Sequence, residues 1–106
     1  MDTFSFRTLV VLQDDPADGN TILARVDQSS GGDGPSLPTL YRCLRTCLRE
    51  GWIDATAARE AVGRGRPGQI YRLTERGAAA LAAEAQAHRQ LAALVFGDQA
   101  SGKGNL

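Results

Sequence analysis

Three arginines with helical spacing are the first residues in this sequence that suggest a chemistry. Arg42, Arg45 and Arg49 stand three and four residues apart, so in a helix they fall within about 60° of one another around the axis. A guanidinium group can donate two parallel hydrogen bonds to guanine O6 and N7, and it pairs well with phosphate. The row is therefore a candidate surface for the DNA major groove. The alternative is that it only solvates the polar face of an amphipathic helix.

The segment around these arginines predicts a helix from Ser36 to Glu50. Ser36 is a good N-cap, Pro38 suits the first turn, and Gly51 is a usual residue just past a helix end. We expect the face opposite the arginines to enter the core, and it carries Leu37, Leu40, Leu44, Cys47 and Leu48, with Tyr41 and Cys43 at its edges. Because the N-terminal part of such a helix meets base edges, the candidate DNA contacts are Ser36, Pro38, Thr39, Tyr41, Arg42, Arg45 and Arg49.

A second basic cluster lies in a glycine-rich segment. Arg59, Arg64 and Arg66 stand between two predicted strands, and the stretch GRGRPG contains no acid. Glycines let a loop tip approach another backbone closely, and arginines there suit a narrow groove or the phosphates beside it. Arg64 and Arg66 are therefore further candidate DNA contacts, unless the loop is only a solvated one. The 12 basic and 12 acidic residues cancel, yet the helix and this loop still predict a locally basic surface.

The order of the expected elements predicts a winged helix-turn-helix fold, which is mainly α with a small β-hairpin. Two helices precede the arginine-bearing one, and two short strands and a long final helix follow it. We expect a helix over Thr3–Gln13, a turn over Asp14–Asp18, and a second helix that is opened by Asn20 or Thr21 and continues through Val26. A loop over Ser29–Pro35 precedes the arginine-bearing helix. Strands are expected at Trp52–Ile53 and Ile70–Leu73, with a loop or hairpin tip between them at Asp54–Gln69, and the final helix is capped by Thr74 and ends near Phe96.

The final helix carries an apolar stripe that a small domain leaves uncovered. The stripe repeats at three-to-four spacing, and its candidate dimer-interface residues are Leu81, Ala85, His88, Leu91, Ala92 and Val95. A twofold homodimer would place two recognition helices about 34 Å apart on one DNA face. The alternative is a helix that folds back on its own chain. We therefore assign residues 1–74 to a DNA-binding domain, 75–96 to a C-terminal dimerisation helix and 97–106 to a disordered tail.

The two cysteines are expected to be reduced residues in or near the core. Cys43 and Cys47 stand four apart in a predicted helix, where a structural disulfide is geometrically poor. A zinc site needs about four ligands, and the single histidine, His88, lies far along the chain. Redox sensing stays an alternative. Free cysteines, with no signal peptide and no long apolar run, indicate a cytoplasmic protein without a membrane segment.

No recognisable arrangement of catalytic residues is present, so an enzyme is not expected. The sequence has no phosphate-binding loop and no Ser-His-Asp or Cys-His pattern, and we predict neither a cofactor nor a metal site. A length of 106 residues suits one compact domain. The remaining alternative is a winged-helix module that docks onto a protein and does not bind DNA. Three arginines on one helix face would be unnecessary for that purpose.

Two blocks of residues resemble PadR-type transcriptional regulators of the short branch, which have one C-terminal helix. The first block runs from Pro38-Thr39-Leu40-Tyr41-Arg42 to Leu48-Arg49-Glu50-Gly51-Trp52-Ile53. The second is Gly65-Arg66-Pro67 followed by Ile70-Tyr71-Arg72-Leu73-Thr74-Glu75-Arg76-Gly77. The resemblance covers roughly residues 5 to 96.

This resemblance implies a homodimeric repressor that binds a palindromic operator in double-stranded DNA and dimerises through its C-terminal helix. It also implies, by position, DNA contacts from Thr39, Tyr41 and Arg42 on the helix and from Arg64 and Arg66 on the wing. Some relatives release DNA when an aromatic or drug-like molecule binds at the dimer interface, so a small-molecule effector is a further expectation. Gly19-Asn20 departs from the glycine-tyrosine pair that often opens the second helix in relatives.

Overall fold

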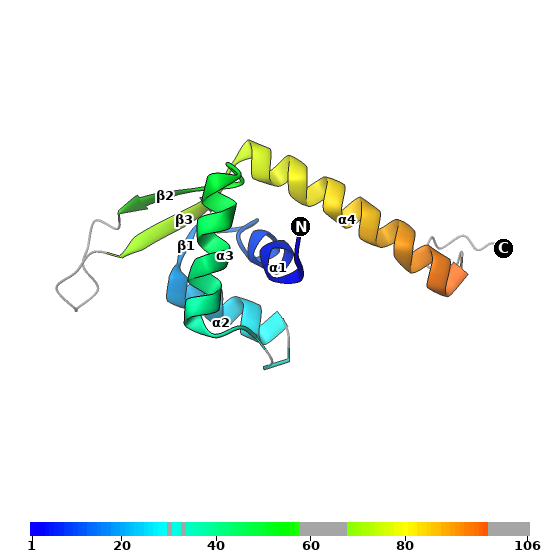
Figure 1. Cartoon of the computed structure of the whole chain (residues 1–106), viewed down its shortest axis with the longest axis horizontal. Coiled ribbons are helices and arrows are strands. Elements are labelled where there is room, and N and C mark those ends of the chain that lie inside the picture. Colours follow the sequence, from blue (N-terminus) through cyan, green and yellow to red (C-terminus); the bar gives the residue numbers. More distant parts are fainter. Residues whose placement is uncertain (30, 33, 58–67, 98–106) are drawn as a thin grey trace.

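The computed structural model describes residues 1–29, 31–32, 34–57 and 68–97, and these form a group of helices with a small sheet at one side (Figure 1). No helix in these ranges is long and apolar enough to cross a membrane. The elements in chain order are α1 (Thr3–Val11), β1 (Ala17–Asp18), α2 (Gly19–Ser29), α3 (Leu37–Arg49), β2 (Ile53–Ala57), β3 (Gln69–Leu73) and α4 (Glu75–Phe96). The expected winged-helix order is confirmed.

Side chains cap the starts of the helices. The Ser36 hydroxyl accepts the Thr39 N–H at 3.4 Å to open α3, and the Thr74 hydroxyl accepts the Gly77 N–H at 2.9 Å to open α4, both as predicted. The expected cap of α2 at Asn20 or Thr21 is wrong. The carboxylate of Asp18 accepts the Thr21 N–H at 2.8 Å, because the helix begins one residue earlier than its apolar spacing suggested. Hydrogen bonds from Thr21 lower the pKa of Asp18.

Helix α1 forms the centre of the fold. It packs against α2, α3 and α4, so that it lies between the arginine-bearing helix and the long final helix (Figure 1). The core between these elements is made by fully buried side chains from three helices, chiefly Leu9, Ile22, Val26, Leu40 and Leu44. Burying each of these side chains contributes roughly 1.5–3 kcal/mol. The position of α3 is therefore determined mainly by its apolar face.

The sheet has three antiparallel strands in the order β1-β3-β2, which corrects the expected two-stranded hairpin. Ala17 pairs with Tyr71 and both side chains are buried. A two-residue strand gives no alternating pattern from which it could be predicted. Strand β2 also extends to Ala57, past the point at which the sequence predicted a loop. Asp54 pairs there with Arg72 across the strands, with a 3.4 Å ion pair between the two exposed side chains.

The end of α3 is tied to the start of α4. Gly51 has φ +79°, a conformation that favours glycine, and its carbonyl accepts the Thr74 hydroxyl at 2.6 Å. The Glu50 carbonyl at the helix end accepts from Arg76 Nε at 2.8 Å. The Trp52 carbonyl accepts the Thr74 N–H at 3.0 Å and lies so close to Gly77 that a Cβ there would overlap it. We call these five residues and Gly77 the α3–α4 junction.

Candidate nucleic-acid interface

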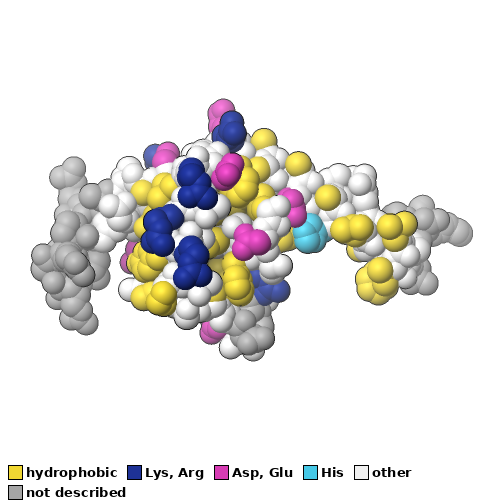
Figure 2. Space-filling model, viewed as in Figure 1, with side chains coloured by type: hydrophobic (Ala, Val, Ile, Leu, Met, Phe, Trp, Pro, Cys, Tyr) yellow, Lys and Arg dark blue, Asp and Glu magenta, His cyan; other side chains and the backbone are white. Residues whose placement is uncertain are grey.

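Helix α3 separates a buried face from a basic one. Leu40, Cys43, Leu44 and Cys47 are buried, whereas the side chains of Arg42, Arg45 and Arg49 are exposed. In the part of the chain that the structure describes, no ion pair involves any of these three guanidinium groups. Figure 2 shows basic side chains in a row on the face that α3 presents. The row predicted from the sequence is therefore exposed and available to an anionic ligand.

An apolar edge borders the arginine row, which differs from the expected core stripe. Leu37 and Leu48 were predicted to be in the core, but they are 37% and 38% exposed, and so is Tyr41 at 37%. The buried sector of α3 is centred between Cys47 and Leu40 instead. Leu37 and Leu48 therefore fall about 60–80° from Leu40, at the margin of the helix that α1 and α2 do not cover. Apolar side chains at such a margin can contact thymine methyl groups.

Tyr41 occupies its position because residue 19 is a glycine. A Cβ on Gly19 would overlap the Tyr41 hydroxyl, so the ring lies directly on the backbone at the start of α2. This contact joins the two helices of the helix-turn-helix. The family resemblance marked Gly19-Asn20 only as a departure from the usual pair, and it could not show that the small residue admits an aromatic ring from α3.

The first turn of α3 places further polar groups near the row. The Ser36 hydroxyl donates to Thr39 Oγ1 at 3.0 Å while it also accepts the Thr39 N–H. Pro38 is exposed beside them. An unpaired backbone N–H at a helix start attracts anions such as phosphate. The predicted contacts thus lie on α3 and its N-cap, with the three arginines between Thr39 on the side toward α1 and Tyr41 on the side toward α2.

The predicted wing contacts Arg64 and Arg66, together with Arg59, lie outside the described residues. The base of the wing is described, because β2 and β3 pair from Ile53 with Leu73 to Ala57 with Gln69. Arg72 in β3 is an additional cation that the sequence analysis did not include, although its partner Asp54 neutralises it locally.

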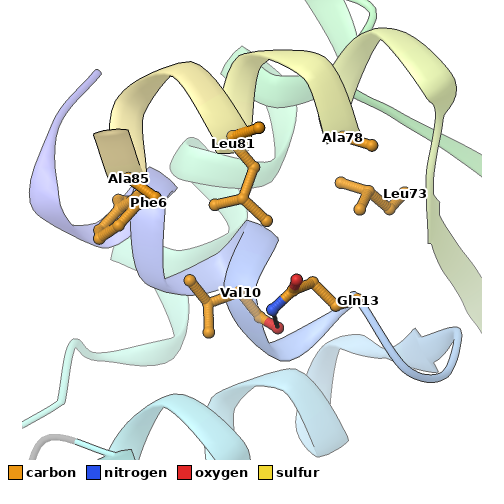
Figure 3. A pocket seen from close by; sticks show the side chains of 8 residues that line it. Phe6, Val10, Gln13, Leu73, Ala78, Leu81 and Ala85 are labelled. Atoms are coloured by element: carbon orange, nitrogen blue, oxygen red, sulfur yellow. Dashed lines mark hydrogen bonds between the residues drawn. The ribbon is translucent and has the colours of Figure 1, made fainter. Parts of the chain in front are cut away.

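Helix α4 divides into a packed half and an exposed half. Figure 3 shows Leu81 pointing from α4 toward Phe6 and Val10 of α1, across a groove of about 190 Å³. His88, 54% exposed, stacks on Phe6 with ring centroids 4.6 Å apart, and its Nε2 lies 3.2 Å from a Glu84 carboxylate oxygen. Leu81 is buried in its own chain, so this predicted interface residue already has an intramolecular role.

Beyond His88 the helix is apolar and exposed, as the apolar side chains at the right of Figure 2 show. Leu91 is 61% and Val95 76% exposed, and the predicted stripe includes both. Leu94 and Phe96 are exposed as well, and Leu94 lies about 120° around the helix from the centre of the stripe. The sequence analysis omitted these two because it followed a single face. The unbroken apolar run Leu94-Val95-Phe96 was the signal for an end that is apolar on all sides.

The sequence of this chain can now be compared with those of known families. The pattern of the transcriptional regulator PadR-like family matches residues 8–83. This chain belongs to that family. The matched range contains α2, α3, the sheet and the packed half of α4, which are the elements described above. The resemblance inferred from the two sequence blocks is confirmed, and members of this family are transcriptional regulators and not enzymes.

Solved structures of PadR-family proteins share the fold. A PadR-family regulator from Clostridium difficile superposes with a TM-score of 0.78 at 18% identity, covering 90% of this chain and 96% of the other. A putative transcriptional regulator from Thermoplasma acidophilum gives 0.74 at 21% identity, with 95% and 93% covered. Bacillus subtilis PadR, solved in complex with operator DNA, gives 0.66 at 20% identity, with 76% of this chain and 45% of the other covered.

A search of curated proteins finds no match to this PadR-family chain. Identities of 15–22% among the similar structures mean that the likeness is one of fold. The residues that contact a ligand are therefore inferred from the side chains of this chain.

Proposed function

We propose that this regulator binds double-stranded DNA as a homodimer and represses transcription, with α3 in the major groove. The observation that carries the proposal is the row of Arg42, Arg45 and Arg49, exposed and without ion pairs among the described residues, on the helix whose opposite face is fixed in the core. Guanidinium groups that already had carboxylate partners would have to lose them before they bound DNA. These groups can form bidentate bonds to guanine or phosphate directly.

The first turn and the wing complete the proposed contact surface. Ser36, Pro38 and Thr39 lie where the start of a recognition helix meets base edges and phosphates, and Tyr41 lies at the margin of the row. Arg64 and Arg66 are proposed to contact the adjacent groove or its phosphates. Bacillus subtilis PadR, which shares the fold, was solved in complex with operator DNA, and this supports DNA as the partner. The division into a DNA-binding part at 1–74 and a dimerisation helix at 75–96 is part of the proposal.

The exposed half of α4 supports the homodimer. A helix that is apolar on all sides is normally buried, yet Leu91, Leu94, Val95 and Phe96 are exposed in a single chain. A second copy of the same helix, related by a twofold axis, would cover them and the stripe residues Ala85, His88 and Ala92. The dimer would also present two α3 helices to one side of the DNA.

Replacing Leu91 with glutamate is expected to convert the dimer to a monomer. Burying an unpaired carboxylate in an apolar interface costs several kcal/mol, whereas the same group is harmless at a residue that is 61% exposed in the monomer. Sedimentation velocity at micromolar concentration measures the change. The control is Gln86→Glu, which adds the same charge at an exposed residue five positions earlier, on the side of the helix away from the stripe. A Leu91→Glu protein that stays dimeric would refute this interface.

The DNA-binding proposal is tested by fluorescence anisotropy with DNA from upstream of the protein's own gene, at two salt concentrations. We expect binding that is selective over a random duplex and that weakens steeply with salt, because each phosphate contact releases counterions. Equal affinity for both duplexes would leave only non-specific binding. No binding to either would favour the protein-docking alternative.

A small-molecule effector that releases DNA is also proposed, and it would bind between α1 and α4. The groove there has an apolar lining that includes Phe6, Val10, Leu73 and Leu81, but its volume of about 190 Å³ is below the roughly 300–1,000 Å³ of typical ligand sites. The α4 helix of a second chain would have to complete it. The proposal predicts that an aromatic effector lowers DNA affinity in the dimer and does not bind the Leu91→Glu monomer.

A further inference from the structure

A cavity lies between α1 and α3, and the proposed function assigns it no ligand. Its volume is about 300 Å³, and one of its walls is the cysteine Cys43, which is 8% exposed. At roughly 30 Å³ for a water molecule in the liquid, the space would hold a molecule of several non-hydrogen atoms. The lining residues are Asp2, Phe4, Ser5, Thr39, Arg42, Cys43 and Thr46. Two of these, Thr39 and Arg42, are candidate DNA contacts, so the cavity borders the proposed DNA-contact surface of α3.

Polar groups converge on the sulfur of Cys43. Ser5 Oγ lies 3.3 Å and Thr8 Oγ1 3.8 Å from Cys43 Sγ. Among the described residues, Ser5 and Thr8 are the buried polar side chains. A thiol has only one proton to give, so at least one of these two hydroxyls must donate to the Cys43 sulfur.

These donors favour the anionic form of the sulfur. The hydrogen bond from Cys47, helped by those from Ser5 and Thr8, outweighs burial and lowers the pKa of Cys43 to about 6. Interaction with Cys43 and burial raise the pKa of Cys47. Since the thiolate is the nucleophile, the pair is asymmetric: one sulfur can react and the other stabilises it.

We propose that Cys43 is a site of covalent modification by small uncharged electrophiles of the α,β-unsaturated carbonyl class, which bind in the α1–α3 cavity. Cys43 Sγ adds to the β-carbon of the electrophile and forms a C–S bond. The C=C π bond breaks to give an enolate, whose α-carbon takes up the proton that the thiol has released. No oxidant or other reactant is needed. The product occupies the space between α1 and the recognition helix and thereby weakens DNA binding, a consequence that rests on the proposed function, whereas the site itself does not.

The site is tested on the full chain with methyl vinyl ketone, by mapping modified peptides with mass spectrometry between pH 5.5 and 9. In the folded protein we expect the Cys43 rate to level off near pH 7 and Cys47 to react at least tenfold more slowly, following the asymmetry of the pair. In denaturant, both rates should rise about tenfold per pH unit up to roughly 8.5. Folded-state rates that are equal for the two cysteines, or that rise up to pH 8.5, would overturn the proposal.

Two variants distinguish a thiol whose reactivity depends on the hydrogen bond with Ser5 from one that reacts only because it is accessible. Ser5→Ala removes a donor 3.3 Å from the sulfur and is expected to shift the levelling of the Cys43 rate to higher pH. Thr46→Ala is the matched control, because Thr46 lines the same cavity but directs its hydroxyl to the Arg42 carbonyl at 3.3 Å. An identical shift in both variants would show that cavity shape, and not the hydrogen bond, controls the reaction.

The regulatory consequence is measured by DNA anisotropy before and after modification. Modified wild-type protein should bind its upstream DNA at least tenfold more weakly, whereas the reagent should not change the affinity of Cys43→Ala or, if that variant folds poorly, Cys43→Ser. Equal weakening of the Cys43 variants, or no weakening of the wild type, would overturn the link to DNA. Failure of the proposed function is distinguished because it removes binding by the unmodified protein and leaves the labelling profile intact.

Discussion

Replacing Gly77 with alanine is expected to destabilise the fold by about 3 kcal/mol, as an extreme case of overpacking. A Cβ at this position would overlap the Trp52 carbonyl oxygen. That carbonyl cannot easily move, because it accepts the Thr74 N–H at 3.0 Å and follows the fixed end of α3. Helix propensity alone predicts the opposite sign, since alanine in a helix is favoured over glycine by roughly 1 kcal/mol. The free energy of unfolding in urea measures the effect.

Ala79→Gly is the control for this prediction. Ala79 is exposed two residues further along α4, so the change should cost only the roughly 1 kcal/mol of helix propensity. If Gly77→Ala is as stable as the wild type or more stable, the close approach at the α3–α4 junction does not exist in solution.

Removing the guanidinium group of Arg42 is expected to weaken specific DNA binding by about 1–3 kcal/mol per contact. In a twofold dimer the contact occurs twice, so Arg42→Ala should lower the affinity for the operator by at least tenfold. The side chain is exposed at the N-terminal end of the α3 row and has no ion pair among the described residues, so its removal should leave the unfolding free energy nearly unchanged. Anisotropy titrations against specific and random duplexes measure the effect.

The matched control is Arg89→Ala, which removes an exposed arginine from α4 and should leave DNA affinity unaltered. Arg42→Lys keeps the charge but loses bidentate geometry, so it separates the two ways in which Arg42 can contact DNA. A base-reading Arg42 predicts loss of selectivity in the lysine variant. A phosphate contact predicts that Arg42→Ala weakens both duplexes alike, with a salt slope smaller by about one. Wild-type affinity in Arg42→Ala would exclude either role.

The features that the sequence predicted are those encoded within one element. The row of Arg42, Arg45 and Arg49, the cap at Ser36 and the stop at Gly51 depend on local spacing and on single residues with strong preferences. The winged-helix order followed from the same local signals.

The features that were missed depend on contacts between distant segments. Strand β1 exists because Ala17 pairs with Tyr71, which is 54 positions away, and two residues cannot show periodicity. Leu37 and Leu48 were predicted to be core residues because the spacing of apolar residues in one helix does not show how much of that helix its neighbours cover. The environment of Cys43 needs Ser5 and Thr8 from another helix, so its unequal partnership with Cys47 could not be seen from their spacing of four.

The α3–α4 junction has a mechanical consequence. Its hydrogen bonds join the end of α3 to the start of α4, a helix of 22 residues that is about 33 Å long. Because of these hydrogen bonds, α3 and α4 move as one rigid unit. In the proposed dimer, a change of about 5° in the tilt of α4 displaces its far end by roughly 3 Å relative to α3 over that length. The angle at which two copies of α4 cross thus sets the spacing at which the two arginine rows meet the DNA.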